Sequence, residues 1–468
     1  MKFKQVDVIS LKNRPFSRKE REDERPWNEQ RPEAYSLVFR VVAVVDGQQF
    51  IGLGECRPSR ISNEILRRSH RHARRIARYL PILTEALDWT LGDSDSLEDA
   101  PRQVHELVQR AVSELFGFAD TDERRQRPTP SIFFGLEMAL LDVIAKSRGM
   151  SVAEMTTGSS SAVVKRNVFS DRLKNPEALI KDIRKGKALS GWLRLSRRID
   201  TDRAVVLLNF LRQALAEQST SIDGVILSAG QRWSAEDWDS FCEAVKPMEL
   251  EEAGVGKVII EDPFPEESDA FYLTAFERCR DLPVRIMLSR PVWGCASLEP
   301  LSAYLPYVDL RVTPQKVGGF HETLRLEQEA IEAGFQGSIY LGNVPSSTNL
   351  NTLALMTLAS AMPSCDMFSA GARDDGRVRL VYPTPAERSD ELHFPEGAGW
   401  CVNLCRSGVR KRMAALNAYD NDGRVSEWAA RKSLMKSVLD DRFVSRPLAQ
   451  GEGEHSDAAI KSLFQGKR

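Results

Sequence analysis

The chain has 468 residues, and its 65 lysine and arginine residues balance 66 aspartate and glutamate residues, so the formal net charge is -1. This balance gives no general attraction to nucleic acid or to an anionic membrane, and the length predicts more than one domain. No apolar run is long enough to span a bilayer. The scattered cysteines and the absence of a signal-peptide core predict a cytoplasmic protein.

The N-terminal region is expected to form a mixed sheet-and-helix domain. Its three β-type segments are VDVIS, SLVFRVVAVV and QQFIGLGE, and the turn signal Asp46-Gly47 joins the last two into a hairpin. Residues 62–117 then show a helical pattern. The helix predicted at 63–80 is rich in arginine, which indicates either a solvated helix face or a site for an anionic partner. These arginines are Arg67, Arg68, Arg71, Arg74, Arg75 and Arg78.

From residue 163 onward, short β-rich runs alternate with amphipathic helical stretches. The eight runs are VVKRNVFS, GWLRLS, DGVILS, GKVIIEDP, PVRIMLS, YVDLRVT, GSIYLG and CDMFSA. This number and spacing favour a (β/α) barrel over a doubly wound open sheet. No G-x-G-x-x-G fingerprint follows the first strand, and no phosphate-binding P-loop motif is present.

In such a barrel the active site forms where the strands end, so the last residues of each run are the candidates. Most of them are polar or charged, and the predicted order places them around one mouth. They are Arg194 and Ser196, Ser228, Glu261 and Asp262, Ser289 and Arg290, Thr313, Gln315 and Lys316, and Asn343 and Ser346.

Several segments together resemble the enolase superfamily, which includes mandelate racemase and muconate-lactonizing enzyme. SIFFGLEMALLDVIAKSRGMSVAEM resembles the helix that enters the barrel, and VVDGQQFIGLGECRPS the last hairpin of the capping domain. VIIEDPFPEE and the stretch 312–319 resemble the fourth and sixth barrel strands. IYLGNVPSSTNLNTLALMTLASAM is most similar to the seventh strand and following helix of methylaspartate ammonia-lyase. FPEGAGWCVNL resembles the segment that returns to the capping domain.

The resemblance covers residues 2–406 and implies an α/β protein, in which an N-terminal α+β capping domain covers a (β/α)7β TIM-type barrel. We therefore predict a capping domain at 1–130, the barrel at 131–385, a return segment at 386–410 and a helical extension with a loose tail at 411–468. Superfamily members usually form dimers or larger rings, so a homo-oligomer is expected.

The resemblance also implies a chemistry, in which three carboxylates on the third, fourth and fifth strands hold Mg²⁺. The metal stabilises the enolate formed when a base removes the proton next to a carboxylate. In this chain the three ligand positions fall on Ser228, Glu261 and Ser289, or on Arg290 with a shift of one residue. Glu261 is thus the one retained metal ligand, and a single carboxylate does not offset the dehydration of Mg²⁺ as three do.

The usual bases are also replaced. The lysine pair of the second strand falls on Arg194 and Ser196, and the lysine of the sixth strand falls on Thr313, or on Val312 with a shift. Arginine stays protonated at neutral pH and does not act as a base. Lys316 lies beyond the expected position, and none of the six histidines lies near the end of the seventh strand.

Two interpretations of the charged residues stay open. Glu261 is either a remnant metal ligand or a structural carboxylate paired with Arg290 or Arg194. The two arginines either grip a carboxylate or phosphate together or neutralise Glu261 and Asp262. In the predicted entry helix, Asp142 is expected to be a satisfied structural acid.

Three functional hypotheses follow. The first is a divergent protein, a pseudoenzyme, that binds a small carboxylate or other anion at the mouth, with the usual Mg²⁺-assisted α-proton abstraction lost or strongly altered. The second is an active carbon–nitrogen or carbon–oxygen lyase or isomerase with a reorganised site, in which Glu261 and Asp262 hold the metal and Lys316 and Arg194 are catalytic. The third is an interaction protein that uses the arginine-rich helix and the C-terminal extension. In the first hypothesis the ligand contacts are Arg194, Ser196, Ser228, Ser289, Arg290, Thr313, Gln315, Asn343 and Ser346, and neither nucleic acid nor membrane is a partner.

Overall fold

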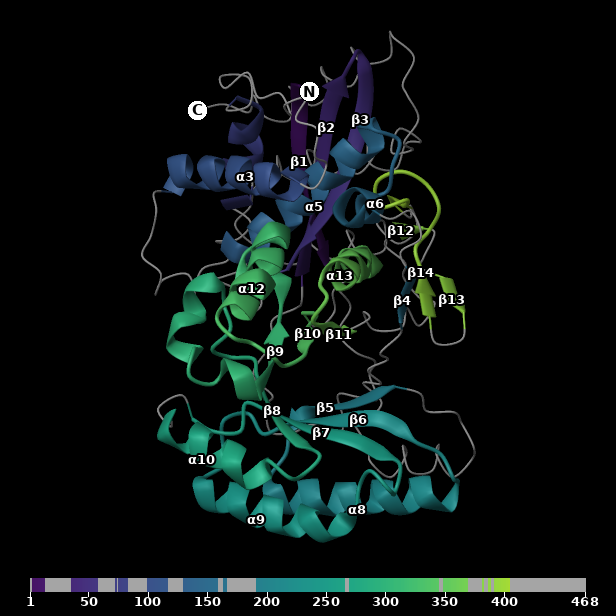
Figure 1. The fold of residues 1–468 in the computed structure, drawn as a ribbon. Helices are drawn as coiled ribbons and strands as arrows, with labels where there is room; N and C mark the ends of the chain where they lie inside the picture. The colour runs from purple at the N-terminus through teal and green to yellow at the C-terminus, as the bar shows by residue number, and fades with distance from the viewer. Residues whose placement is uncertain are drawn as a thin grey trace, which may run out of the picture.

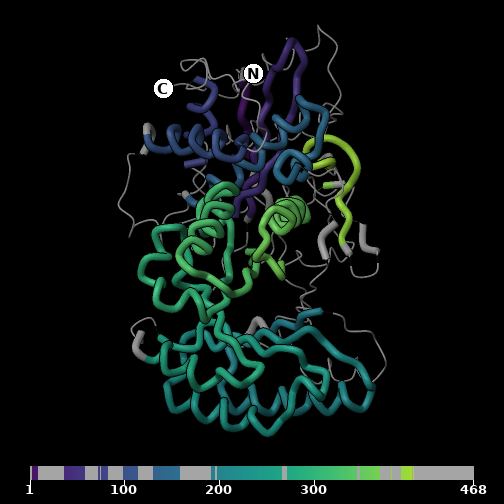
Figure 2. The backbone as a smooth tube through the Cα atoms, in the orientation of Figure 1, coloured from purple at the N-terminus to yellow at the C-terminus, as the bar shows by residue number. Residues whose placement is uncertain are grey.

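A computed structural model gives the fold of the chain. It describes residues 2–12, 35–57, 72–73, 75–82, 99–116, 129–158, 163–165, 191–265, 269–344, 348–368, 381–382, 386–388 and 391–404. An antiparallel sheet with its helices lies at one end of the molecule, and a larger parallel sheet with its helices occupies the rest (Figure 1). The backbone trace shows the last described strands returning toward the N-terminal sheet (Figure 2).

The N-terminal sheet consists of β1 (Lys2–Lys12), β2 (Tyr35–Val45) and β3 (Gln48–Cys56), paired antiparallel in that order. Asp46 and Gly47 join β2 to β3 with φ values of 51° and 78°. Positive φ suits a tight hairpin turn and is favourable for glycine and tolerated by aspartate. The three strands and the hairpin predicted from the sequence are confirmed.

Helix α5 (Thr129–Ser147) covers this sheet so closely that glycine is required on β3. A Cβ at Gly52 would lie 1.9 Å from the carbonyl oxygen of Ala139, and a Cβ at Gly54 would lie 1.9 Å from that of Gly135. Helix α3 (Ala100–Phe116) packs on α5 in turn. The long apolar helix that the sequence places at the start of the barrel is therefore also the main support of the capping sheet.

The parallel sheet has the spatial order β11-β10-β9-β8-β7-β6-β5, so strands adjacent in the chain are also neighbours in space. Repeated strand–helix units with parallel pairing produce this order. Figure 1 shows α8 and α9 along the outer side of β5–β7. The strands are β5 (Trp192–Arg198), β6 (Ile222–Ser228), β7 (Val255–Glu261), β8 (Val284–Leu288), β9 (Val308–Val312), β10 (Ile339–Leu341) and β11 (Cys365–Phe368). The helices are α6 (Val152–Thr157), α8 (Thr201–Glu217), α9 (Ala235–Val245), α10 (Asp269–Cys279), α11 (Pro314–Val317), α12 (Phe320–Glu332) and α13 (Asn349–Ala361), with 3₁₀ turns at Lys246–Met248, Cys295–Ser297, Glu299–Leu301 and Leu305–Tyr307.

Seven of the eight predicted runs form this parallel sheet, whereas the described part of the first run does not. That part is β4 (Val163–Lys165), and it pairs antiparallel with β14 (Glu391–His393), which pairs in turn with β13 (Ala386–Arg388). The expectation that VVKRNVFS opens the parallel sheet is therefore wrong for these three residues. They fill the free edge of a hairpin from the return segment instead, because an unpaired strand edge favours any strand that reaches it.

The inner face of the curved sheet has two layers, one apolar and one polar. The apolar layer is a separate cluster of buried side chains, contributed by Trp192, Ile226, Ile259, Met287, Tyr340 and Met367. Side chains two residues apart on a strand share a face, so the positions two residues further on form the next layer. On β5 to β8 these positions are Arg194, Ser228, Glu261 and Ser289. The sequence thus switches from apolar to polar as each strand approaches the mouth.

The return segment is locked onto the capping domain through Trp400. Its indole Nε1 donates to the carbonyl oxygens of Leu53 and Met138, both at 3.1 Å, and its backbone N–H donates to Asp142 at 2.8 Å. Asp142 also accepts from the backbone N–H of Leu53 and from Lys146 Nζ, both at 2.8 Å. The predicted return of FPEGAGWCVNL and the structural role of Asp142 are confirmed.

Two further short strands, β12 (Val381–Tyr382) and β15 (Asn403–Leu404), pair with each other. None of the described helices is both long enough and apolar enough to cross a membrane. The predicted domain boundaries stay predictions, as does the helical extension at 411–468, which lies outside the described residues.

Candidate functional site at the barrel mouth

The carboxyl ends of the strands bring the predicted site residues to one edge of the parallel sheet. Strand β6 ends at Ser228 and β7 ends at Glu261, and these two residues are direct partners in the sheet register. Ser289 and Thr313 each follow directly after their strands, β8 and β9. The three positions that the resemblance assigns to metal-binding carboxylates are therefore next to one another, with Glu261 between two serines.

Glu261 is buried, and each of its carboxylate oxygens accepts a hydrogen bond from a different arginine. Arg194 on β5 donates from Nη2 to Oε2 at 2.6 Å, and Arg311 on β9 donates from Nη1 to Oε1. The carboxylate is 3% exposed, whereas the two arginine side chains keep 15% and 16% of their surface exposed. The arginines therefore close over Glu261 and still reach the solvent side of the mouth.

Tyr340 on β10 forms the floor beneath both arginines. The guanidinium carbons of Arg194 and Arg311 lie 5.8 and 5.4 Å from the centre of its ring, within the range of cation–π attraction. Two residues further along, Gly342 leaves the space that Arg311 needs, because a Cβ there would lie 2.7 Å from Arg311 Nε. The arginines are thus held by a carboxylate on one side and an aromatic face on the other.

The electrostatic consequence is a strongly acidic Glu261. Burial on its own would raise the pKa of this carboxyl, but the charges and hydrogen bonds of Arg311 and Arg194 outweigh burial and lower the pKa to about 2. Glu261 is therefore ionised at neutral pH. Among the described residues, two guanidiniums thus face one carboxylate.

Asp262, the next residue, serves the loop after β8. Its Oδ1 accepts backbone hydrogen bonds from Ser289 at 2.7 Å and from Arg290 at 3.1 Å, and its backbone has a φ of 46°. Burial and the neighbouring Glu261 charge raise the pKa of Asp262 to about 6, against the opposing effect of these N–H groups. Its position fixes loop geometry and does not add a second carboxylate beside Glu261.

Lys316 supports the same loop from α11. Its Nζ donates to the backbone carbonyl oxygens of Ser289 at 2.6 Å and of Arg290 at 2.8 Å. These two carbonyls occupy two of the three N–H donors of the ammonium group. This geometry matches a structural cation and gives no support to a general base.

The described side chains around Glu261 do not fit Mg²⁺. This ion needs near-octahedral oxygen coordination and is usually held by one or more carboxylates. Here both oxygens of the one carboxylate bond to guanidiniums, and its neighbours at the other two ligand positions are serines. Across the part of the chain that the structure describes, no three His, Cys, Asp or Glu side chains are grouped to hold a metal ion.

Comparison with known proteins gives the fold its name. No protein-family profile and no curated protein sequence matches the chain. Among solved structures, muconate lactonizing enzyme from Pseudomonas putida matches with a TM-score of 0.61 and 15% identity, over 88% of this chain and 99% of that one. Dipeptide epimerase from Enterococcus faecalis V583 matches with a TM-score of 0.61 and 16% identity, over 86% and 99%. This chain has the enolase-superfamily fold.

A third match extends the same conclusion. A mandelate racemase/muconate lactonizing protein from Herpetosiphon aurantiacus has a TM-score of 0.59 and 17% identity, over 86% of this chain and 98% of that one. The matched structures are thus covered almost completely, so the capping domain and the barrel are both shared. The predicted superfamily architecture is confirmed, while the chemistry of this chain depends on its own residues.

The predicted pairing of Glu261 with Arg290 or Arg194 is confirmed for Arg194. The guanidinium of Arg290, the alternative partner, donates instead to Gln231 on the exposed side of the loop. Arg311 is the second partner and was not predicted, because it lies one residue before the end of β9 and outside the strand-end positions. Strand alternation could have indicated this role, because Arg311 is two residues before Thr313 and the two side chains therefore share the inward face of the sheet.

Of the remaining predicted ligand contacts, Gln315 and Asn343 belong to one chain of hydrogen bonds. Gln315 donates to Asn351 Oδ1 at 3.0 Å, and Asn351 donates to Asn343 Oδ1 at 2.5 Å, so α11, α13 and the end of β10 are tied together. Ser346 and the side chain of Ser196 lie outside what the structure describes. Of the arginine-rich helix, only Arg75 and Arg78 are described, so its proposed partner stays a prediction.

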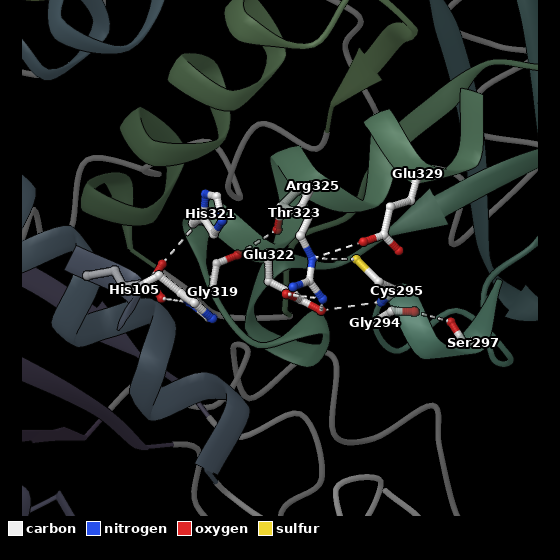
Figure 3. Close-up of polar contacts among 11 residues, drawn as sticks. His105, Gly294, Cys295, Ser297, Gly319, His321, Glu322, Thr323, Arg325 and Glu329 are labelled. Atoms are coloured by element: carbon white, nitrogen blue, oxygen red, sulfur yellow. Dashed lines mark hydrogen bonds and ion pairs between the residues drawn. The ribbon is translucent and has the colours of Figure 1, made fainter. Parts of the chain in front are cut away.

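A second polar cluster joins the capping domain to α12 on the outside of the barrel (Figure 3). His105 Nδ1 lies 2.6 Å from Glu137 Oε1, and Glu137 Oε2 accepts from the backbone N–H groups of Phe320 at 2.5 Å and His321 at 3.2 Å. A carboxylate at a helix N-terminus is favourable. Glycine is required at position 319, because a Cβ there would lie 2.5 Å from Glu137 Oε1. This cluster is a docking contact and lies apart from the mouth.

Proposed function

We propose that this protein binds a small carboxylate or another small anion at the barrel mouth, and that the superfamily's Mg²⁺-assisted α-proton abstraction is lost or strongly altered. One observation carries the proposal. Arg194 and Arg311 bond to both oxygens of Glu261, the carboxylate that would have remained as a metal ligand. A cationic pair thus stands where the superfamily chemistry requires a metal bound by acids.

The electrostatics of the pair favour an anionic ligand. Among the described residues, two guanidiniums face the one carboxylate of Glu261, and both arginine side chains keep an exposed part. Arg311 Nε finds no hydrogen-bond acceptor in the described part of the chain. A guanidinium offers five N–H donors in a plane, and it binds carboxylates and phosphates with two parallel hydrogen bonds. A small anion would use the donors of Arg311 that Glu261 leaves over.

The residues that correspond to the superfamily's catalytic bases support the same proposal. Arg194 occupies the position of a catalytic lysine but stays protonated, and Lys316 is bonded to two loop carbonyls. Neither residue is placed to accept a proton from a substrate. The lyase or isomerase hypothesis would need both a reorganised metal site and a different base, so the binding hypothesis agrees better with the contacts.

The test is ligand binding by isothermal titration calorimetry with acetate, lactate and benzoate as probes. We expect at least one probe to bind wild-type protein and its affinity to fall about tenfold or more in Arg311→Met, since a charge-assisted hydrogen bond contributes roughly 1.5–3 kcal/mol. Arg203→Met is the matched control, because Arg203 lies on the exposed face of α8. Equal affinity of the wild-type and Arg311→Met proteins would refute the proposal.

A second readout addresses the altered chemistry. Wild-type protein incubated in D₂O with Mg²⁺ and a panel of hydroxy and amino acids should show no exchange of the proton next to the carboxylate, followed by NMR. Exchange that depends on Mg²⁺ and disappears in Glu261→Gln would favour the active lyase or isomerase.

A further inference from the structure

The polar cluster of Figure 3 brings two histidines from opposite sides of a joint beside one buried carboxylate. The rings of His105 on α3 and His321 on α12 have their centres 5.3 Å apart. Glu137 on α5 is 1% exposed, and its Oε1 lies 2.6 Å from His105 Nδ1. Its Oε2 accepts from the backbone N–H groups of Phe320 and His321. Both oxygens of Glu137 are therefore engaged.

Glu137 also stands in for the missing cap of α12. The N-cap residue of this helix is Gly319, and no side chain of its own caps the first turn. The first N–H groups of a helix need acceptors from outside the helix, and here Glu137 provides one from α5. The first turn of α12 thus depends on a carboxylate that also pairs with His105.

The charge balance of the cluster accommodates one imidazolium and not two. A proton on His105 is stabilised by Glu137, because a buried charge needs a bonded partner of opposite sign. A second proton, on His321, would place two like charges side by side in a partly buried site, where their repulsion is only weakly screened.

The carboxylates on α12 are engaged by Arg325 on the same helix. Glu322 accepts from Arg325 Nη2 at 3.1 Å and from the backbone N–H of Cys295 at 3.3 Å. Glu329 lies 3.2 Å from Arg325 Nε. Among the described residues, neither carboxylate bonds to His321, so a proton there would lack a bonded counter-charge.

The other elements around the joint supply no further acid to His321 among the described residues. On α3, Arg102 pairs with Asp99 and Glu106, and on α11, Lys316 Nζ donates to two loop carbonyls. Burial raises the pKa of the Cys295 thiol to about 12, so it is neutral. Helix α13 contains no ionisable side chain.

The pKa values agree with this charge balance. Burial lowers the pKa of His105, but its charged neighbours, led by Glu137, outweigh burial and raise the pKa above its usual value. Burial, the charge of His105 and the nearby guanidiniums lower the pKa of His321 to about 4. His105 therefore takes the first proton, and His321 is neutral at pH 7.

We propose that this cluster is an acid-sensitive joint, in which uptake of a proton by His321 separates the first turn of α12 from α3 and α5 while the rest of the barrel stays folded. The inference goes beyond the proposed function, because it concerns the contact between the capping domain and α12 and not the mouth. Histidine pairs at interfaces are suited to this task, since their charge changes within a narrow range of pH.

The experiment is hydrogen–deuterium exchange of the full chain at pH 7 and pH 5, followed by mass spectrometry and corrected for the intrinsic pH dependence of exchange. Peptides covering 319–326 report on the joint, and peptides covering 222–261 report on the barrel. We expect protection of 319–326 to fall at least about threefold at pH 5, because the open form takes up a proton at His321 more readily than the closed form. His105 opposes this effect in part, and the barrel peptides should keep their protection.

The variant His321→Asn isolates the proton. It keeps a neutral polar side chain, so we expect wild-type protection of 319–326 at pH 7 and no fall at pH 5. His321→Gln provides a second neutral replacement if the first does not fold. His393→Asn is the matched control, because His393 lies on β14, away from the joint, and this variant should keep the wild-type response.

Three results would overturn the inference. The first is unchanged protection of 319–326 in wild-type protein between pH 7 and pH 5. The second is an equal fall in wild-type protein and in the His321 variants, which would assign the effect to another group. The third is a parallel loss of protection in the barrel peptides, since acid would then unfold the chain as a whole and not open this joint.

Discussion

Two buried carboxylates in this molecule, Asp142 in the capping domain and Glu261 at the barrel mouth, are satisfied in different ways. Asp142 accepts from two backbone N–H groups and from Lys146, and all three donors are internal to the interface between α5, β3 and the return segment. Glu261 accepts from two side chains that remain partly exposed. Backbone donors fix a joint between elements, whereas the side-chain donors of Glu261 come from two strands on either side of β7.

The pKa values of Asp142 and Glu261 differ in opposite directions from the usual value of a carboxyl group. Burial raises the pKa of Asp142, because the charge and hydrogen bond of Lys146 and the two backbone donors only partly compensate for it. At Glu261, two guanidiniums outweigh burial and lower the pKa to about 2. The Asp142–Lys146 pair is thus close to electrically neutral, whereas the Glu261 carboxylate is paired with two guanidiniums.

The largest effect is expected from Asp142→Ala, because it breaks the joint at three donors at once. Removing one partner of a buried ion pair costs about 3–5 kcal/mol of unfolding free energy. Urea denaturation followed by circular dichroism measures this loss. Asp239→Ala is the matched control, since Asp239 pairs with Arg278 on the exposed surface, and it should change stability by less than about 1 kcal/mol. A small effect of Asp142→Ala would contradict a structural role.

A smaller loss is expected from Glu261→Gln, about 2 kcal/mol, because the two arginines left behind keep some contact with water. The double variant Glu261→Gln with Arg311→Met should be less destabilised than the sum of the single variants, since the second change removes a charge that the first leaves unpaired. Urea denaturation of the four proteins gives the coupling. Strict additivity would show that the two groups do not interact.

The smallest effect is expected in the pH dependence of folding stability, through His321 in the polar cluster that joins the capping domain to α12. Burial, the neighbouring His105 and the charges of Arg325 and Arg102 lower the pKa of His321 to about 4 from a usual value near 6.5. The unfolded chain then binds more protons than the folded chain between these values, so stability falls as the pH drops from about 6.5 to 4. His321→Asn should flatten this part of the stability profile. An unchanged profile would mean that His321 does not titrate differently on folding.

Much of this site could be predicted from sequence because strand ends in a parallel barrel meet at one edge. Glu261, Ser228 and Ser289 are where the run boundaries placed them. The same reasoning missed Arg311, since its role depends on the register between β7, β8 and β9 and on the space that Gly342 leaves. Strand alternation along β9 limits the possible partners of Glu261 to the inward-facing residues, but only the packed sheet shows which arginine reaches this carboxylate.

Contacts between segments that are distant in the sequence were harder to predict. The return of Trp400 to the capping domain was predicted through resemblance, whereas its partners Leu53 and Asp142 depend on three-dimensional packing. The three residues of β4 show the reverse case. Their composition is that of a barrel strand, but pairing depends on which edge is free, and a hairpin from the return segment supplies one.

The most direct test of the central claim compares Mg²⁺ with a small carboxylate as ligands of the mouth. Titration calorimetry should show carboxylate binding to wild-type protein that Arg311→Met weakens, and no Mg²⁺ binding that depends on Glu261. Micromolar Mg²⁺ binding that disappears in Glu261→Gln would contradict this account, because it would show that the arginines yield the carboxylate to a metal.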